Sequence, residues 1–352
     1  MFQFRKKNQS ILGLDIGSRE IKAVELTRTG GGFAVTRLAA KPLVSEQAAV
    51  ETLRQLAQES KFKTMRTISS VSGRSVVVRY ITMQPMTAAE LRTAMKYEAE
   101  KYIPFGMDEV VIDSQCLEGA PEKGRRGAEM KVLLVAAKRD LIVQHINTLS
   151  QAGFQPAVVD VDAFALGNSY RFVRASALDT APPAGEGGAS KVVGIVDIGA
   201  SKTNINIARG RISMFTREIY VGGNDFTNSI SRYKGLNFNE AEGMKLNPST
   251  PKEELEGAVG LTIEDLGNEI QLSFDYFENQ FEAEVSEVLL TGGGSLLRGL
   301  AEAFEVKFRK STKVWNPLAE VPVQAGSFDA EVIQDVGPRT AIALGLASRM
   351  NI

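Results

Sequence analysis

The sequence predicts an α/β protein with two lobes of the same fold and a small β/α insert in the first lobe. At 352 residues the chain is longer than one small core needs. The phrase ILGLDIGSREIKAVEL at 11–26 is repeated as VVGIVDIGASKTNINI at 192–207. A segment rich in Pro, Gly and Ala, 179–190, separates the two copies in the manner of a linker. This repeat indicates a duplicated unit with a cleft between the copies.

Composition and charge exclude several classes of protein. The chain has 41 basic and 42 acidic residues, which argues against a nucleic-acid-binding protein, because that class usually has a basic excess. The one cysteine, Cys116, cannot form an intramolecular disulfide and suits a reducing compartment. No apolar run is long enough to span a bilayer, and no signal-peptide core follows the charged N-terminus. We therefore expect a cytoplasmic protein.

Alternating apolar residues predict the strands of the first lobe, which lie at 11–16, 21–27 and 30–43 and, around Gly73, within 66–83. A tight turn at Gly17 and Ser18 joins the first two strands. A helix is expected after the third strand, at 45–60, because Leu53 and Leu56 share one face. Ser45 is its expected N-cap.

An insert is expected at 81–153. Thr87 and Glu90 have the spacing of a capping box at the start of its first helix, and Pro104 closes that helix. Two strands follow, at 109–118 and 129–138, with a charged loop between them.

A second helix of the insert stops at Gly153 and has three apolar residues on one face, Ile142, Ile146 and Leu149. His145 on this helix has no partner in the sequence pattern, so we expect it to be solvated. No cluster of His and Cys supports a zinc site.

The second half repeats the opening strands and is then mostly helical from 224 to 280. A buried strand ends in three glycines, and a helix is expected from Ser295. The chain divides into a first-lobe core at 1–80, 154–180 and 337–352, the insert at 81–153, a second-lobe core at 190–232 and 285–336, and a small helical subdomain at 233–284.

The repeated phrase has the residue types of a phosphate site. A strand delivers Asp15 to its end, Gly17 permits a turn whose N–H groups can bind an anion, and Ser18 adds a hydroxyl. Asp15 has the wrong sign to contact phosphate but suits a hydrated Mg²⁺ that bridges phosphates. One such hairpin is more often a simple turn. Two equivalent copies favour a clamp in which Asp15 and Asp197 flank the metal.

A glycine run follows the last buried strand of the second half. Gly292, Gly293 and Gly294 would let a flat ligand such as adenosine approach the backbone closely. The run is not a Walker loop, because no Lys-Ser/Thr pair follows it, and Leu297 breaks a GxGxxG pattern.

Taken together, LGLDIGSREIK, VDIGASKTN and LLTGGGSLLRGL resemble the first phosphate, second phosphate and adenosine motifs of the actin/DnaK/sugar-kinase superfamily. The resemblance spans nearly the whole chain and implies a two-lobed actin-like (ribonuclease H-like) ATPase fold. It implies ATP and Mg²⁺ as cofactors, with metal contacts from Asp15 and Asp197. The nucleotide contacts that it implies are Gly17, Ser18, Lys22, Gly199, Ala200, Ser201, Gly222, Gly223, Asn224, Glu242, Lys245, Gly292, Gly293 and Gly294. For Lys22, Glu242 and Lys245, a solvated surface position is an equally good interpretation.

A carboxylate near the first connecting segment would accept a proton from the attacking water. Of Asp160 and Asp162, Asp160 is favoured because it ends a strand, while helix capping is the alternative for either residue. The sequence predicts ATP binding better than ATP hydrolysis, which would be weak or slow if present.

Within the superfamily, the insert and the phrase MQPMTAAELRTAMKYEAEKYIPF resemble the FtsA-like branch and, within it, the PilM family of type IV pilus proteins. This resemblance implies a cytoplasmic ATP-binding scaffold that binds the N-terminal peptide of the membrane protein PilN. It implies contact with other inner-membrane and motor components of the pilus, and recruitment to the inner membrane only through partners. It is also compatible with homo-oligomers. The peptide groove would involve Glu98, Tyr102, Ile103 and Phe105, although these aromatic residues could instead close the core of the insert. An FtsA-like filament former and a small-molecule kinase are the alternatives.

Overall fold

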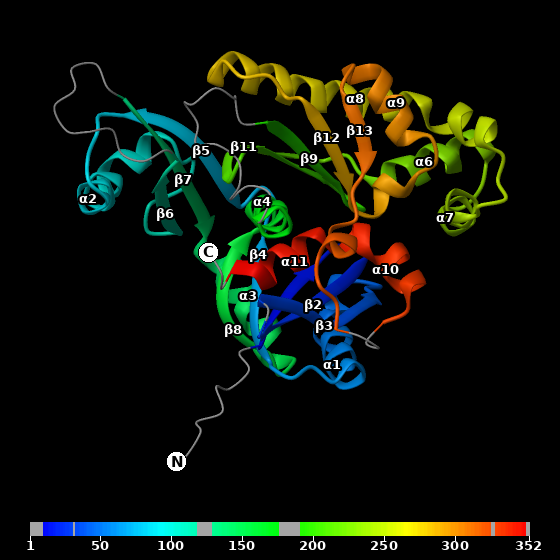
Figure 1. The fold of residues 1–352 in the computed structure, drawn as a ribbon, viewed down its shortest axis with the longest axis horizontal. Helices are drawn as coiled ribbons and strands as arrows, with labels where there is room; N and C mark the ends of the chain where they lie inside the picture. The colour runs from blue at the N-terminus through cyan, green and yellow to red at the C-terminus, as the bar shows by residue number, and fades with distance from the viewer. Residues whose placement is uncertain (1–9, 31, 118–128, 176–190, 325–327, 350–352) are drawn as a thin grey trace.

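Two lobes lie one above the other, with helices α4 (Asp162–Val173) and α11 (Ala341–Ser348) between them (Figure 1). A smaller sheet lies to one side. The computed structural model describes residues 10–30, 32–117, 129–175, 191–324 and 328–349. The predicted linker at 179–190 therefore lies outside the described residues, as does nearly all of the charged loop of the insert.

The first lobe is built on a five-stranded sheet with the order β3-β2-β1-β4-β8. Strand β1 is antiparallel to β2 and parallel to β4. The strands are β1 (Ser10–Ile16), β2 (Glu20–Thr29), β3 (Gly32–Pro42), β4 (Arg66–Val71) and β8 (Gln155–Val161). Helix α1 (Ala49–Ser60) packs on this sheet through Leu53 and Leu56, as expected. Ser45 makes no capping hydrogen bond, because a 3₁₀ turn (Glu46–Ala48) separates it from the helix.

The second lobe repeats this order as β11-β10-β9-β12-β13, with the same strand directions. Its strands are β9 (Val192–Ile198), β10 (Thr203–Arg209), β11 (Ile212–Ile219), β12 (Glu287–Thr291) and β13 (Ser311–Val314). Its main helices are α6 (Gly223–Lys234), α7 (Phe238–Leu246), α8 (Lys252–Phe281) and α9 (Leu300–Phe308). The duplication predicted from the repeated phrase is therefore confirmed.

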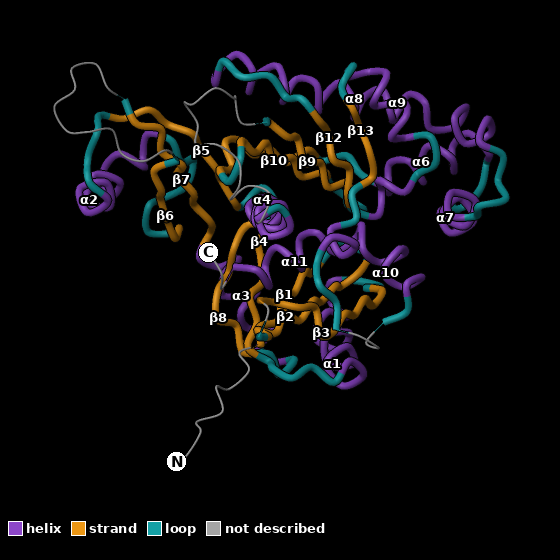
Figure 2. The backbone as a smooth tube through the Cα atoms, in the orientation of Figure 1, coloured by secondary structure: helices purple, strands orange, loops and turns teal. Residues whose placement is uncertain are grey.

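The two lobes meet through α4 and α11, which cross at close range (Figure 2). A side-chain carbon added at Gly345 would lie 1.8 Å from the carbonyl oxygen of Ala165, so only glycine fits at this crossing. Along α11, every side chain from Ala341 to Ser348 is buried. Such tight packing leaves little free space where the two helices cross. A third helix, α10 (Ala330–Val336), precedes the 3₁₀ turn that leads into α11.

The insert has a three-stranded antiparallel sheet with the order β5-β7-β6, partnered by α2 (Ala88–Glu98). Its strands are β5 (Val76–Met83), β6 (Val110–Cys116) and β7 (Met130–Lys138). The predicted capping box is confirmed: the N–H of Glu90 donates to Thr87, and Glu90 accepts from the N–H of Thr87. Pro104 does not end this helix, because α2 already passes into a 3₁₀ turn (Ala99–Lys101) after Glu98.

Helix α3 (Arg139–Gln151) packs against the first lobe rather than the insert. Leu149 lies in a core with Leu12 and Leu14, whereas Ile146 is exposed. The predicted face of this helix is thus only partly right, because Ile146 and Leu149 have different surroundings. We propose that the inserted subdomain runs from β5 to β7, which is shorter than 81–153. Over the residues that the structure describes, no helix has the length and apolarity needed to cross a bilayer.

Candidate functional site

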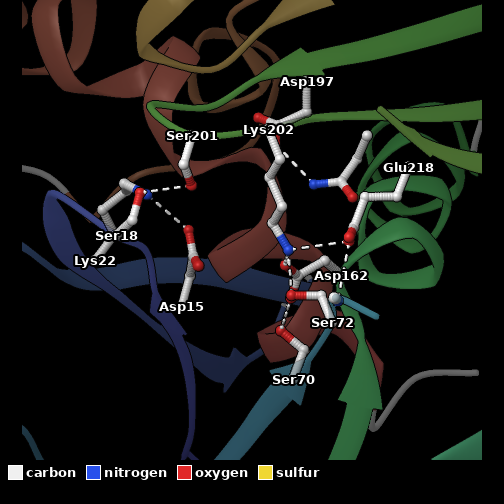
Figure 3. Close-up of polar contacts among 12 residues, drawn as sticks. Asp15, Ser18, Lys22, Ser70, Ser72, Asp162, Asp197, Ser201, Lys202 and Glu218 are labelled. Carbon is white, nitrogen blue, oxygen red and sulfur yellow. Dashed lines mark hydrogen bonds and ion pairs between the residues drawn. The ribbon is translucent and has the colours of Figure 1, made fainter. Parts of the chain in front are cut away.

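The two copies of the repeated phrase form two matching turns that face each other across the lobes (Figure 3). In the first turn the N–H of Gly17 donates to the carbonyl of Glu20 at 3.1 Å, and in the second the N–H of Gly199 donates to Lys202 at 2.8 Å. The Ser201 hydroxyl donates to the Ser18 hydroxyl at 2.9 Å. The lobes therefore touch directly where a ligand gripped by both turns would lie.

Each turn follows a buried acid at the end of a central strand. Asp15 is paired across the hairpin with Lys22, whose Nζ lies 2.7 Å from Asp15 Oδ2. Asp197 is paired in the same register with Asn204, whose amide donates to Asp197 Oδ2 at 3.4 Å. Asp15 and Asp197 are 5% and 7% exposed, so both carboxylates are withdrawn from bulk water.

Burial affects the pKa values of Lys22 and Asp197 with different outcomes. Burial alone would lower the pKa of Lys22, but the charge and hydrogen bond of Asp15, aided by Asp197, raise it above its ordinary value. Burial raises the pKa of Asp197 to about 6, and the attraction of Lys22 only partly opposes it. The site thus holds one acid in a direct ion pair with Lys22 and one acid that accepts a hydrogen bond from a neutral amide.

A second polar cluster lies beside the turns and is centred on Lys202 (Figure 3). Its ammonium group is 2.8 Å from Asp162 Oδ2 and 3.1 Å from Glu218 Oε2, and it also donates to the Ser72 hydroxyl. Ser70 donates to Asp162 at 2.6 Å. Burial would raise the pKa of Asp162, but the charge and hydrogen bond of Lys202 outweigh it and hold that pKa low. Lys202 therefore ties the second turn to the first lobe.

The structure separates Asp160 from this cluster. The carboxylate of Asp160 forms an ion pair with Arg349 and accepts the N–H of Val161 at 2.8 Å. Asp162 instead begins α4 and points toward the turns (Figure 3). The two acids lie two residues apart, but the chain passes from strand to helix between them, so they point in different directions. The acid that the structure brings beside the turns is Asp162.

The start of α6 supports the second turn from behind. The N–H groups of Gly223 and Asn224 donate to the carbonyls of Gly199 and Ala200 at 2.9 and 2.7 Å. A side-chain carbon on Gly222 would lie 2.6 Å from the Gly199 carbonyl oxygen. Gly222, Gly223 and Asn224 are thus placed at the turn, where they fix its backbone.

Glu242 and Lys245 come from α7 and meet the start of α6. The ammonium group of Lys245 lies 2.7 Å from Glu242 Oε2, 3.0 Å from the Gly223 carbonyl and 2.7 Å from the Thr227 hydroxyl. Burial lowers the pKa of Lys245, although Glu242 opposes this. From the first turn, the guanidinium group of Arg19 lies 5.1 Å from the ring centroid of Phe238 on α7. Helix α7 is therefore in contact both with the start of α6 and with the first turn.

The glycine run lies against Asp197. Gly292 has a φ of +83°, and a side-chain carbon there would come within 2.7 Å of Asp197 Oδ1. Gly294 is equally close to Ile198, whereas Gly293 faces only the Arg339 side chain, at 3.8 Å. The helix expected from Ser295 begins later, at Leu300, because a 3₁₀ turn (Gly293–Leu296) follows the strand.

Asp15 and Asp197 could supply only part of the coordination shell of a metal ion. Among the described residues, no group of three or more His, Cys, Asp or Glu side chains gathers to hold a metal ion. Mg²⁺ takes six oxygen ligands and readily keeps several waters or phosphate oxygens among them. The donor set therefore fits a magnesium ion that arrives with a polyphosphate, and does not fit a resident ion bound by the protein alone.

The residues predicted for a partner groove mostly build the insert itself. Ile103 is 6% exposed and lies in the insert core, while Tyr102 and Phe105 pack partly buried against that core. Glu98 pairs with Lys101 at 2.7 Å. This is the alternative that the sequence left open for the aromatic residues. A shallow apolar groove lies nearby, and its lining residues are Met86, Ala89, Glu90, Thr93, Ala94 and Tyr97.

Several residues of the site have no signal in the repeated phrase. Lys202 follows the second turn directly, but its partners Asp162, Ser72 and Glu218 come from three distant segments. His145 was expected to be solvated, and this is wrong: its Nε2 lies 2.8 Å from the hydroxyl of Ser69 on strand β4. Only contacts between distant segments reveal these positions.

The duplicated sheet order and the paired acidic turns define an actin-like ATPase fold, as the sequence predicted. MreB5 of Spiroplasma citri, solved bound to ADP, has this fold; the TM-score is 0.51 at 13% identity, over 96% of this chain and 94% of that one. The cell division protein FtsA of Streptococcus pneumoniae serotype 2 is 24% identical over 240 residues. That match covers 61% of this chain and 49% of FtsA, so the chain spans about half the length of this curated relative.

The sequence also matches a family within this fold. A family model described as type IV pilus assembly protein PilM matches residues 13–351, and the chain belongs to this family. A solved PilM–PilN type IV pilus biogenesis complex contains a chain that is 29% identical, with a TM-score of 0.82 over 96% of this chain and 98% of that one. The family resemblance seen in the sequence is therefore confirmed.

Proposed function

We propose that this chain is an ATP-binding scaffold of the type IV pilus inner-membrane platform, which binds the cytoplasmic N-terminal peptide of PilN. The observation that supports PilN as the partner is the similarity to a chain of the PilM–PilN complex, which extends over almost the full length of the two chains. Membrane association would then come through PilN. The facing turns, with their buried acids, support the nucleotide.

ATP would lie with its phosphates between the two turns. The Ser18–Ser201 hydrogen bond would be replaced by bonds from these hydroxyls to phosphate oxygens, joined by the N–H groups of the turns. Lys22 would add positive charge from the first lobe. Mg²⁺ would supply charge neutralisation between Asp15 and Asp197. Gly292, Gly293 and Gly294 would admit the adenosine, with Glu242 and Lys245 on its other side.

Hydrolysis would be slow in this arrangement. Asp162 is the acid placed to accept a proton from water, so we transfer to it the role first given to Asp160. In the structure Asp162 is occupied by Lys202 and Ser70. An acid held by a cation is a weak base, because its pKa is lowered. Turnover would therefore require the Lys202 contact to open.

The PilN peptide would bind beside the insert, where Tyr102 and Phe105 present the partly exposed rim of its core. Ile103 would support this rim from within, and Glu98 would lie at its edge. Tyr is one of the residue types that supply much of the binding energy in protein interfaces.

The function is tested by titrating a fluorescently labelled PilN N-terminal peptide into the full chain, with and without Mg-ATP. We expect saturable binding that is altered by the nucleotide. Absence of binding in both conditions would refute the scaffold function. A kinase would instead transfer phosphate to a soluble metabolite, and a filament former would show ATP-dependent light scattering.

The metal assignment has its own test. Asp197→Ala should weaken Mg-ATP binding by at least about tenfold, because a carboxylate at the metal is worth more than about 1.4 kcal/mol. Asp113→Ala, at an exposed position of the insert strand β6, is the matched control. Unchanged affinity in Asp197→Ala, measured by isothermal titration calorimetry, would remove Asp197 from the proposed metal site.

A further inference from the structure

We infer that strand β11 couples the second turn to the inserted subdomain, so that nucleotide binding at the turn changes the stability of the insert sheet. This inference rests on the proposed function, because it concerns how the nucleotide site and the partner region communicate. It is carried by contacts near one end and in the middle of one short strand, and by a third contact on α8.

One end of β11 is held at the turn. Glu218 of β11 accepts from Lys202 at 3.1 Å, and Lys202 directly follows Ser201 of the second turn. The same carboxylate accepts the N–H of Gly73 at 3.2 Å, and Lys202 also donates to the Ser72 hydroxyl. Ser72 and Gly73 lead into β5, so the turn is connected to the beginning of the insert sheet by charged hydrogen bonds.

The middle of β11 is held by the insert. The hydroxyl of Tyr80, in the middle of β5, lies 3.1 Å from the hydroxyl of Thr216 on β11. Its ring stacks on Phe215 with a centroid distance of 5.8 Å, and Phe215 in turn contacts Tyr276 of α8 at 5.5 Å. Tyr80 packs against the core of the second lobe and is absent from the core of the insert.

A third contact joins the insert to the end of α8. The ammonium group of Lys131, on β7, lies 3.8 Å from the ring centroid of Phe281 and donates to the Gln280 carbonyl at 3.2 Å. A cation this close to an aromatic face is attracted to it. Two of the three insert strands therefore touch the second lobe, although the chain enters and leaves the insert from the first lobe (Figure 1).

This arrangement makes the insert span the boundary between the lobes. Any change in lobe closure at the turns must either carry the insert along or break its contacts with β11 and α8. Coupling needs contacts that differ between two states of the protein. Replacement of the Ser18–Ser201 contact by phosphate would shift the second turn. Lys202 and Glu218 would pass that shift to the start of β5 through Ser72 and Gly73, and β11 would pass it to the middle of β5 through Tyr80.

The test is hydrogen–deuterium exchange of β5 and β7 amides in the full chain, with and without saturating Mg-ATP. In the unchanged protein we expect ATP to alter exchange in these strands by about fivefold or more, the lower end of usual coupling strengths. The double variant Tyr80→Ala, Lys131→Ala keeps the contacts of Ser72 and Gly73 but should lose most of this response. It should still bind ATP, since neither residue belongs to the nucleotide site or to the insert core. Tyr80→Phe keeps the ring and should retain part of the response.

The matched control is Tyr97→Ala, which removes a tyrosine of the insert that is 76% exposed on α2. It should respond to ATP as the unchanged protein does. An undiminished response in the double variant, or no response in an unchanged protein that binds ATP, would overturn the coupling and leave the proposed function intact. Failure of the unchanged protein to bind ATP would overturn the proposed function, and the coupling with it.

Discussion

The first and second turns have the same backbone but different electrostatics. Each follows the central strand of a sheet of the same order, and each acid is paired in the same register with the residue seven positions later. In the first turn that residue is Lys22, and in the second it is Asn204. Asp15 therefore has a full countercharge at 2.7 Å, whereas Asp197 has only a neutral amide at 3.4 Å.

The two turns therefore share a backbone scaffold, and the residue opposite each acid, Lys22 or Asn204, decides whether that acid has a direct ion pair. The second turn does have a lysine, Lys202, but its ion pairs are with Asp162 and Glu218 and not with Asp197. A buried carboxylate without a countercharge gains most from an incoming cation. We therefore expect the metal of a nucleotide to be held more by Asp197 than by Asp15.

The test with the largest expected effect removes the partner of each acid. Lys22→Ala leaves Asp15 buried and unpaired, which should lower the free energy of unfolding by about 3–5 kcal/mol. Asn204→Ala removes only a long hydrogen bond to Asp197 and should cost about 1 kcal/mol. Urea denaturation of the nucleotide-free protein measures both values. Equal losses would mean that the two turns are electrostatically alike.

A second test removes the acids themselves. Asp15→Asn leaves Lys22 without its main partner and should destabilise the protein by about 2 kcal/mol. Asp197→Asn should stabilise it by about 1–2 kcal/mol near pH 8 without ligand, because the buried charge is lost.

The sign of the second effect depends on pH. The pKa of Asp197 is raised from 3.8 to about 6, so its ionisation opposes folding as pH rises through this window. The gain from Asp197→Asn should therefore be present above about pH 6 and vanish toward about pH 4. Denaturation curves across this range measure it, and a gain that grew at low pH would contradict the assignment.

A smaller test concerns the contact between the turns. Ser18→Ala, Ser201→Ala and the double variant form a cycle whose coupling energy should be about 0.5–1 kcal/mol without nucleotide. With Mg-ATP bound the coupling should disappear, because phosphate oxygens would take the place of the bond between the hydroxyls. Thermal unfolding with and without Mg-ATP gives both values. Coupling that persists in full would show that no phosphate enters between the turns.

Local patterns predicted much of this molecule correctly. The repeated phrase gave both hairpins and the duplicated lobes, because alternation and turn chemistry act within a few residues. The capping box of Thr87 and Glu90 was likewise found at its place. Three-residue 3₁₀ turns moved the ends of helices away from Ser45 and Pro104, since such turns have no strong sequence signal.

Contacts between distant segments were not predictable in the same way. The choice between Asp160 and Asp162 depends on where the strand ends and the helix begins, and a shift of one residue reverses the side chain. The contacts of Lys202 with Asp162 and Glu218 need the lobes to be placed relative to each other. His145 also gained its partner, Ser69, only through packing of α3 against the first-lobe sheet.

The smallest expected change in stability concerns His145, which has a counterpart in neither turn and contacts the first-lobe side of the site through Ser69. Burial lowers the pKa of this imidazole below 6.5, although Asp162 opposes the shift. His145→Asn should cost about 1 kcal/mol near pH 8 through the lost contact with Ser69. As pH falls through 6.5 the unfolded chain takes up a proton more readily than the folded one, so the histidine loses its advantage. The stability gap between the two proteins should therefore narrow on acidification, as followed by urea denaturation. A gap that widened would mean that the attraction of Asp162 outweighs burial in setting the pKa of His145.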